Sequence, residues 1–181
     1  IVMPTHGFIA PWHVIKHVSR LPCRRMTMAF CVATRAGLKV GPVFPPGLSG
    51  SGTFLISLIL AFKGYRVAGV ASIDMPCNWI ALHPGLTSAS TAAIIARAKP
   101  KALAFIERIT SGRSGWLCLN NLYELVFGAL LFPVALMYLV AGRFYLSKLF
   151  FASNKCTSCG QCAEDCPAGA IRMVGGRKKS P

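Results

Sequence analysis

Four cysteines near the end of the printed chain have the spacing of an iron–sulfur ligand set. They follow the pattern C-x2-C-x2-C-x3-C, and Pro167 comes directly after the fourth. In such a run, a tight loop directs thiolates at the iron corners of a [4Fe–4S] cubane. Gly160 lies inside the loop, where a missing Cβ lets backbone amides approach the sulfides. We expect this cluster to be bound by Cys156, Cys159, Cys162 and Cys166.

Zinc and disulfides are the alternatives for this run. Structural zinc sites usually combine two distant C-x2-C pairs, and two-residue spacings strain a disulfide. The spacings together with the trailing proline favour iron–sulfur chemistry. In two-cluster ferredoxins the fourth cysteine binds the other cluster. No second cysteine run follows here, so the sequence leaves open whether Cys166 binds the same cluster or a second cluster in a longer parent chain.

The composition is apolar and strongly basic. Of 181 residues, 54% are hydrophobic, and 20 Lys and Arg against 5 Asp and Glu give a net charge of +15. This balance fits anionic lipid, nucleic acid or an acidic partner. Nucleic acid is disfavoured because no recognition helix, zinc finger or aromatic RNA-binding signature is present. The other cysteines (Cys23, Cys31, Cys77 and Cys118) are scattered, which is typical of small buried side chains in a reducing cytoplasm.

Residues 1–115 show an alternation of apolar strands and helices. This order is typical of a doubly wound parallel sheet, in which ligands lie at the carboxyl ends of the strands. The predicted loop between the second strand and the second helix is 35–52, and the third helix is expected to break near Pro100. Strands are expected at 1–3, 26–34 and 66–73, and helices at 11–21, 53–63 and from 88 or 90 to 109.

Two polar segments leave the carboxyl ends of the first two predicted strands. They are Pro4–Phe8 and Thr34–Gly37, and each is either a contact for a planar cofactor or an ordinary turn. The order of elements resembles the latter part of a flavodoxin-like domain, and both segments resemble the loops that flavodoxins place beside the flavin ring. With the cysteine run, the chain resembles the bacterial fusion family in which a flavodoxin-like domain precedes a two-cluster [4Fe–4S] ferredoxin.

The resemblance implies FMN contacts in these two loops. The chain departs from the family because no strand and phosphate loop precede Pro4 and because 41–46 is a proline-rich insert. We therefore expect FMN in a longer parent chain. His13 and His17 are a possible metal pair without a third ligand, and a solvated helix face is the favoured interpretation. The implied flavin contacts are Thr5, His6, Gly7, Phe8, Thr34, Arg35, Ala36 and Gly37.

An uncharged segment, 125–142, lies between Glu124 and Arg143. Its 18 residues reach the lower limit for a membrane-spanning helix, but Pro133 is expected to kink or split it. A span would separate the α/β part from the cluster, and basic residues flank both ends. We expect a helix–Pro–helix element that lies in the membrane interface or is re-entrant, with a hydrophobic helix docked on the sheet or in an oligomer as the alternative.

The sequence thus predicts three parts: a partial flavodoxin-like α/β domain at 1–115, an apolar helical connector at 116–150 and the first half of a ferredoxin-type module at 151–181. The predicted function is electron transfer between a redox protein donor and acceptor, with a potential on the order of −400 mV. The alternatives are a flavin-dependent oxidoreductase with the cluster as relay, and a membrane-associated electron-input subunit of a larger redox complex. No acid–base constellation is found, which favours a carrier over an enzyme. We expect it in the cytoplasm or on the cytoplasmic face of the membrane.

Overall fold

The computed structural model describes residues 1–77, 86–116, 118–149, 152–166, 169–174 and 177–179. The chain divides into two compact units, Ile1–Leu136 and Met137–Pro181. The division falls inside the predicted connector.

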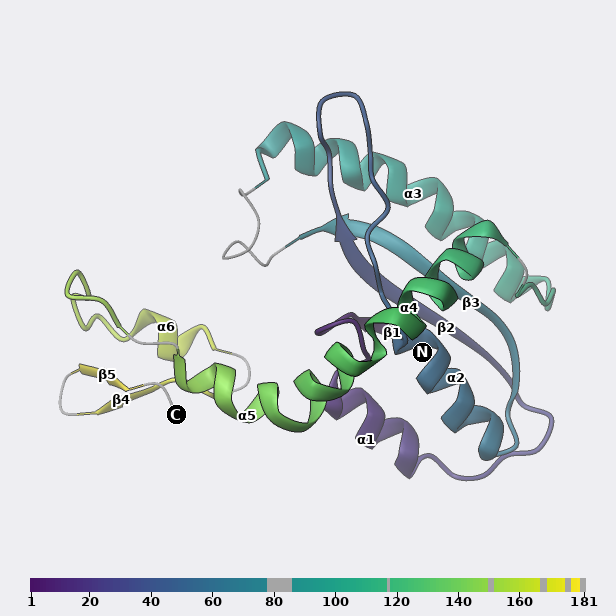
Figure 1. The fold of residues 1–181 in the computed structure, drawn as a ribbon, viewed down its shortest axis with the longest axis horizontal. Coiled ribbons are helices and arrows are strands. Elements are labelled where there is room, and N and C mark those ends of the chain that lie inside the picture. The colour runs from purple at the N-terminus through teal and green to yellow at the C-terminus, as the bar shows by residue number, and fades with distance from the viewer. Residues whose placement is uncertain (78–85, 117, 150–151, 167–168, 175–176, 180–181) are drawn as a thin grey trace. The chain divides into compact units, whose positions relative to one another are not determined.

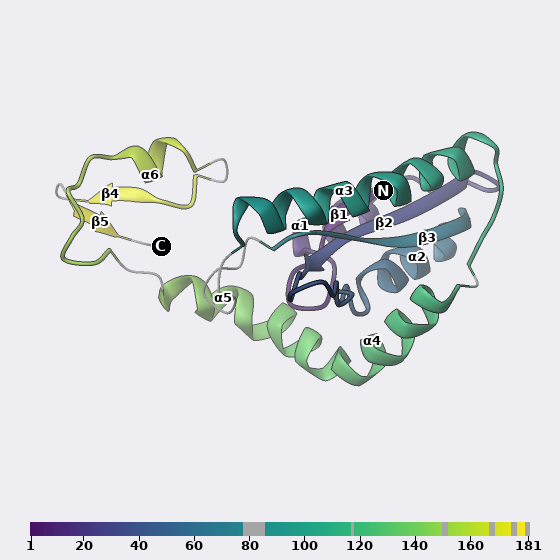
Figure 2. The same cartoon turned by 90° about the horizontal axis from the view of Figure 1, so that it is seen from above.

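The first unit contains a three-stranded parallel sheet with helices on both faces (Figures 1 and 2). The strands, in the spatial order β1-β2-β3, are Val2–Pro4, Met28–Gly37 and Arg66–Pro76. Near-continuous apolar runs suit β2 and β3, since strands of a parallel sheet are buried on both faces. The α/β class is therefore confirmed, and the flavodoxin-like assignment stays a prediction.

Helices α1 and α2 connect consecutive strands and cover one face of the sheet (Figures 1 and 2). Helix α1 spans Trp12–Arg20 and begins after Pro11, whose fixed φ suits a helix start. It buries Ile15 and Val18. Helix α2, Gly52–Phe62, packs on β2 and β3 through apolar side chains that include Ile56 and Leu60.

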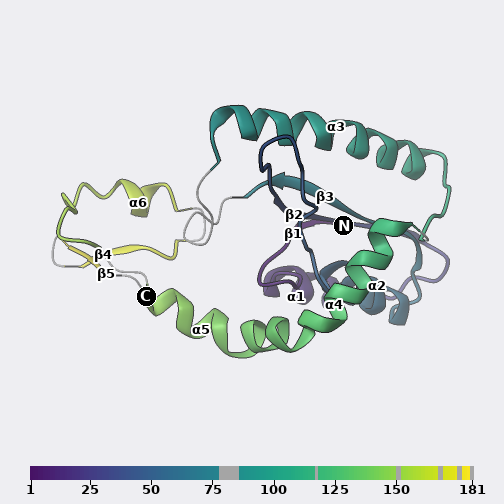
Figure 3. The same ribbon diagram turned by 45° about the horizontal axis from the view of Figure 1, so that its top comes forward.

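Helix α3, Ser88–Thr110, covers the opposite face (Figure 3). Its Phe105 packs edge-to-face on Phe30 of β2, with ring centroids 6.0 Å apart. The predicted break near Pro100 is wrong, because the helix runs through this residue. Proline costs one backbone hydrogen bond, but Ala98 and Phe105 on either side are buried in the core and hold the helix in place.

Strands β2 and β3 each extend three residues beyond their predicted ends. The parallel register continues through Arg35↔Asp74 to Gly37↔Pro76. Thr34–Gly37 therefore belong to a strand, and the prediction that they form a loop is wrong. The charge of Arg35 is compatible with this buried position because it is paired with Asp74 on the neighbouring strand.

Helix α4, Leu119–Met137, begins in the first unit and runs along the same face as α2 (Figure 3). A π-helical turn at Tyr138–Gly142 and the short α5, Arg143–Tyr145, continue it to give a helical run of 27 residues. The helix is not split at Pro133, so that half of the prediction is wrong, and a kink there stays a prediction. Proline removes one amide donor and crowds a preceding carbonyl, which bends a helix without necessarily ending it.

The second unit carries the cysteine run. The one-turn helix α6 spans Gln161–Glu164, and β4, Arg172–Val174, pairs antiparallel with β5, Arg177–Lys179. A 3-10 turn at Leu146–Leu149 follows α5.

Candidate functional site

The cysteine loop reverses direction through two left-handed residues. Ser158 has φ 58° and Gly160 has φ 82°. The Gly160 carbonyl accepts hydrogen bonds from the amides of Ala163 at 2.7 Å and Glu164 at 3.2 Å, so α6 begins directly after the reversal. Glycine adopts this conformation without strain, so Gly160 suits the turn, and the predicted approach of backbone amides to the cluster sulfides stays a prediction.

The four predicted ligands differ in exposure. Cys156 and Cys166 are half-buried, whereas Cys159 and Cys162 are exposed. The amide of Ala170 donates to Cys166 Sγ at 3.4 Å, and that of Gly169 donates to the Cys166 carbonyl at 3.0 Å. Amide-to-sulfur hydrogen bonds of this kind tune the potential of a cluster whose thiolate accepts them. Pro167 lies outside the described residues.

Within the described part of the chain, no three His, Cys, Asp or Glu side chains are grouped to hold a single metal ion. His13 and His17 are both exposed on α1, and no third ligand joins them there. The cysteine run likewise contributes no such group among the described residues. A [4Fe–4S] cubane does not need ligands that meet at a single ion. Each thiolate binds a different iron, so the four sulfurs surround the whole cluster. The donor set of four soft thiolates in one loop fits an iron–sulfur cluster.

Comparison with known proteins agrees with this donor set. Residues 151–172 match the family model of the 4Fe-4S binding domain, Fer4. The second unit therefore contains an iron–sulfur module of the ferredoxin type, and the predicted [4Fe–4S] chemistry is confirmed. No curated protein and no solved structure matches the chain.

The first predicted flavin loop is a tight turn at the carboxyl end of β1. Thr5 donates its amide and its hydroxyl to the Thr34 carbonyl at 3.0 and 2.9 Å. His6 and Ile9 exchange backbone hydrogen bonds of 3.0 and 3.1 Å around Gly7 and Phe8, which have φ 56° and 63°. The turn is thus anchored to Thr34 of β2 and lies at the edge of the sheet where ligands of parallel sheets bind.

His6 lies exposed on this turn. Partial desolvation lowers the pKa of its imidazole, and the positive charge of His13 lowers it further. The imidazole therefore stays neutral over more of the acidic range than an ordinary histidine.

A second loop packs directly on the turn. The carbonyl of Phe8 accepts a hydrogen bond from the amide of Ser51 at 3.0 Å. Gly50 has φ +62°, and a Cβ there would lie 2.2 Å from the Phe8 carbonyl oxygen. The neighbour of the Thr5–Phe8 turn is therefore the loop that precedes α2, which sequence reasoning did not single out.

The other predicted flavin residues lie in β2. Arg35 is directed into the unit, and its side chain is 1% exposed. A cavity of about 240 Å³ at this edge is lined by Arg35 and Gly37, and no described residue of Thr5–Phe8 lines it. The two predicted loops therefore do not share this cavity, and Thr34–Gly37 do not form the loop on which their predicted flavin contact rested.

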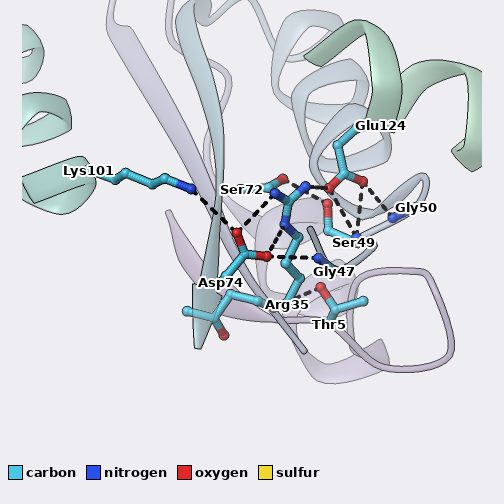
Figure 4. Close-up of polar contacts among 10 residues, drawn as sticks. Thr5, Arg35, Gly47, Ser49, Gly50, Ser72, Asp74, Lys101 and Glu124 are labelled. Atoms are coloured by element: carbon cyan, nitrogen blue, oxygen red, sulfur yellow. Dashed lines mark hydrogen bonds and ion pairs between the residues drawn. The ribbon is translucent and has the colours of Figure 1, made fainter. Parts of the chain in front are cut away.

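Arg35 bridges two carboxylates inside the first unit (Figure 4). Its Nε and Nη2 donate to Asp74 Oδ1 and Oδ2 at 2.8 and 3.2 Å. Its Nη1 donates to Glu124 Oε1 of α4. Burial opposes the charged guanidinium, but the hydrogen bonds and charges of Asp74 and Glu124 outweigh burial and raise the pKa of Arg35.

Asp74 receives two further donors. The amide of Gly47 donates to Oδ1 at 2.9 Å, and Lys101 Nζ of α3 lies 3.4 Å from Oδ2. Burial alone would raise the pKa of Asp74, but Arg35, Gly47 and Lys101 together lower it. The carboxylate is therefore charged throughout the neutral range.

Glu124 ties α4 to the α/β core. Its side chain is 1% exposed, and Oε2 accepts the amides of Ser49 and Gly50 at 3.0 and 2.9 Å. Four residues on, a Cβ on Gly128 would lie 2.8 Å from the Gly50 carbonyl carbon, so the helix touches the loop backbone. We name the group of Arg35, Asp74 and Glu124 the ion-pair cluster.

Sequence reasoning missed the ion-pair cluster, although a signal was present. The chain has only five acidic residues, and Glu124 borders a long uncharged run. An acidic side chain in such surroundings needs a cationic partner, because an unpaired buried charge is very costly. The identity of that partner was not readable, since Arg35 precedes Glu124 by 89 positions.

Proposed function

We propose that this chain transfers single electrons through a [4Fe–4S] cluster. The observation that carries the proposal is the complete ligand spacing inside the matched residues 151–172. The proposed ligands are Cys156, Cys159, Cys162 and Cys166. When bound, such a cluster exchanges one electron at a potential on the order of −400 mV.

The residues proposed to bind the cluster and to tune its potential all lie in or next to the cysteine loop. The exposed Cys159 and Cys162 place one side of the site near solvent, where a redox protein donor and acceptor can approach. The Ala170 amide would stabilise negative charge on Cys166 Sγ. Cys166 lies in the same loop as the other three, which supports one shared cluster. A second cluster held in part by Cys166 belongs to the proposal of a longer parent chain.

A flavin-dependent oxidoreductase is the second candidate function. Its support is the position of Thr5, His6, Gly7 and Phe8 at the carboxyl end of a parallel strand. Thr5 is held at this position by hydrogen bonds to the Thr34 carbonyl of β2. Reconstitution with FMN, followed by flavin fluorescence, tests this candidate. A His6→Ala variant should weaken any binding, and His17→Ala, on the exposed face of α1, is the matched control.

Membrane association is proposed from the apolar helical run. Leu119–Tyr145 has 27 residues and is long and apolar enough to cross a membrane, with 11% of its most apolar stretch buried. In this proposal the protein lies at the cytoplasmic face of a membrane. There it acts either as an electron carrier or as an electron-input subunit of a larger complex.

Anaerobic purification tests the electron-transfer proposal. We expect about four irons and four acid-labile sulfides per chain, and an EPR signal from the reduced form. Cys159→Ser should lower iron content and abolish the cubane signal, because a ligand is lost. Cys118→Ser, outside the run, is the control and should change neither. Cys118 and Cys23 are exposed, so the prediction that the scattered cysteines are buried is wrong for these two. Bound zinc, or fewer than about three irons per chain, would contradict the proposal.

A further inference from the structure

Helix α4 has its polarity reversed relative to an ordinary surface helix. The residues that it buries against the first unit are Asn121, Glu124, Gly128 and Ala135, at spacings of three, four and seven. These are polar or small side chains. A helix on the surface of a soluble domain buries its large apolar residues instead and exposes the polar ones.

The rest of the helix surface exposes large apolar side chains. Leu130 is 71% exposed and Met137 is 64% exposed. Single exposed leucines are ordinary, but a continuous apolar surface along a helix marks a docking site. We name this surface the outer face of α4. Its members include Leu119, Leu122, Leu125, Val126, Leu130 and Met137.

The outer face carries no charge. Among residues 118–142, Glu124 is the one charged residue, and the ion-pair cluster neutralises it inside the unit. At the C-terminal end, Arg143 lies over the Phe144 ring at 4.4 Å and Lys148 over the Tyr145 ring at 5.5 Å. Aromatic and basic side chains at the end of an apolar helix are typical of the membrane interface, where rings lie among the headgroups and cations reach anionic phosphate.

We propose that α4 lies in the plane of a lipid leaflet, with its outer face in the acyl chains and its inner face fixed to the sheet. The bilayer is the favoured occupant because the outer face is uncharged and ends in cations, and because the chain has a net charge of +15. This inference sharpens the membrane contact proposed above and does not depend on the cluster.

The contacts of the inner face argue against a transmembrane orientation. The first unit contains 13 Lys and Arg against three acidic residues, a net charge of +10. Glu124 and Gly128 hold this unit alongside the helix. A perpendicular α4 would either draw these charges into hydrocarbon or break the buried ion pair, and both are costly.

Vesicle flotation of the purified full chain tests the insertion. We expect the wild type to float with phosphatidylcholine vesicles and more strongly with vesicles containing phosphatidylglycerol. Leu130→Glu should lower partitioning at least about tenfold on both, because it places a charge in the acyl region. Leu103→Glu, at a leucine 51% exposed on α3, is the matched control and should stay within about twofold of wild type. Both variants should keep their iron content, which separates this test from that of electron transfer.

Three outcomes would overturn the proposal. The first is a wild type that does not float. The second is flotation only on anionic vesicles, unaffected by Leu130→Glu, which would show binding by headgroup charge alone. The third is a dimer that Leu130→Glu dissociates and that does not float, which would show that a second copy covers the outer face.

Proteolysis of inverted membrane vesicles tests the orientation. Arg113 precedes α4 and Lys155 follows the helical run, so trypsin can cut on both sides of it. An in-plane helix leaves both flanks on the cytoplasmic side, and mass spectrometry should show cleavage at both from that side. Protection of one flank until detergent is added would demonstrate a spanning helix and refute the in-plane arrangement.

Discussion

Replacing Glu124 with glutamine should destabilise the first unit by about 3 kcal/mol. The carboxylate accepts Arg35 at Oε1 and the amides of Ser49 and Gly50 at Oε2. Glutamine offers only one acceptor oxygen, so either Arg35 or the two amides would face an NH2 donor. Breaking a buried ion pair from one side costs about 3–5 kcal/mol. The lower end is expected here, because Arg35 keeps its two hydrogen bonds to Asp74.

Urea unfolding in mild detergent, followed by tryptophan fluorescence, measures this loss. Trp116 is a suitable reporter because its Nε1 donates to the Val67 carbonyl of β3 at 2.8 Å, next to the start of α4. Glu107→Gln is the control, because Glu107 is exposed on α3. Its free energy of unfolding should stay within about 0.5 kcal/mol of wild type.

A double-mutant cycle with Arg35→Met isolates the pair itself. We expect the two substitutions to couple by at least about 1 kcal/mol, because each removes a partner of the other. If Glu124→Gln unfolds like Glu107→Gln, or if the cycle shows no coupling, the ion-pair cluster does not hold α4 to the sheet. The buried ion pair would then no longer oppose a transmembrane orientation of α4.

Three further changes test other parts of the structure. Asp74→Asn should remove stability that is present above about pH 4 and that wild type loses as pH falls through the lowered native pKa, because protonation ends the pairing; urea titrations across pH should show the gap between the two proteins closing in acid, and a constant gap would argue against the pairing. Gly50→Ala should cost at least about 2 kcal/mol in thermal unfolding, because a Cβ would meet the Phe8 carbonyl, whereas Gly41→Ala, with φ +56° and open space, should cost only about 1 kcal/mol; equal losses would refute the close contact. Cys166→Ser should lower iron per chain, and full iron retention would show that Cys166 is not a required ligand of this cluster.

The α/β class was predictable because the buried strands of a parallel sheet are nearly continuous apolar runs in the sequence. The ends of β2 and β3 were not predictable, because Arg35 and Asp74 lie 39 positions apart and only their pairing makes a charged strand end possible. The predictions that the helices break near Pro100 and at Pro133 failed for a related reason. Local propensity disfavours a helix at each proline, whereas the packing of α3 on the sheet and the contacts of α4 with the loop at Gly50 keep the helices intact.

The candidate metal centre was predictable because its information is local. Four thiols and a glycine within eleven residues specify both the ligands and the turn that presents them. The flavin contacts at Thr34–Gly37 rested on the expectation of a loop, which the structure replaces with strand. The uncharged run 125–142 was likewise evident from the sequence. The side of the helix that faces the protein was not, because Glu124 and Gly128 contact Gly50, which is distant in the sequence.

EPR spectroscopy of the anaerobically purified, dithionite-reduced chain tests whether the protein carries a reducible [4Fe–4S] cluster. We expect a reduced [4Fe–4S] signal that integrates to about one spin per chain. The signal should be unchanged in Cys118→Ser and absent in Cys159→Ser. A wild-type signal that survives in Cys159→Ser, or a protein that carries zinc and no reducible cluster, would contradict it.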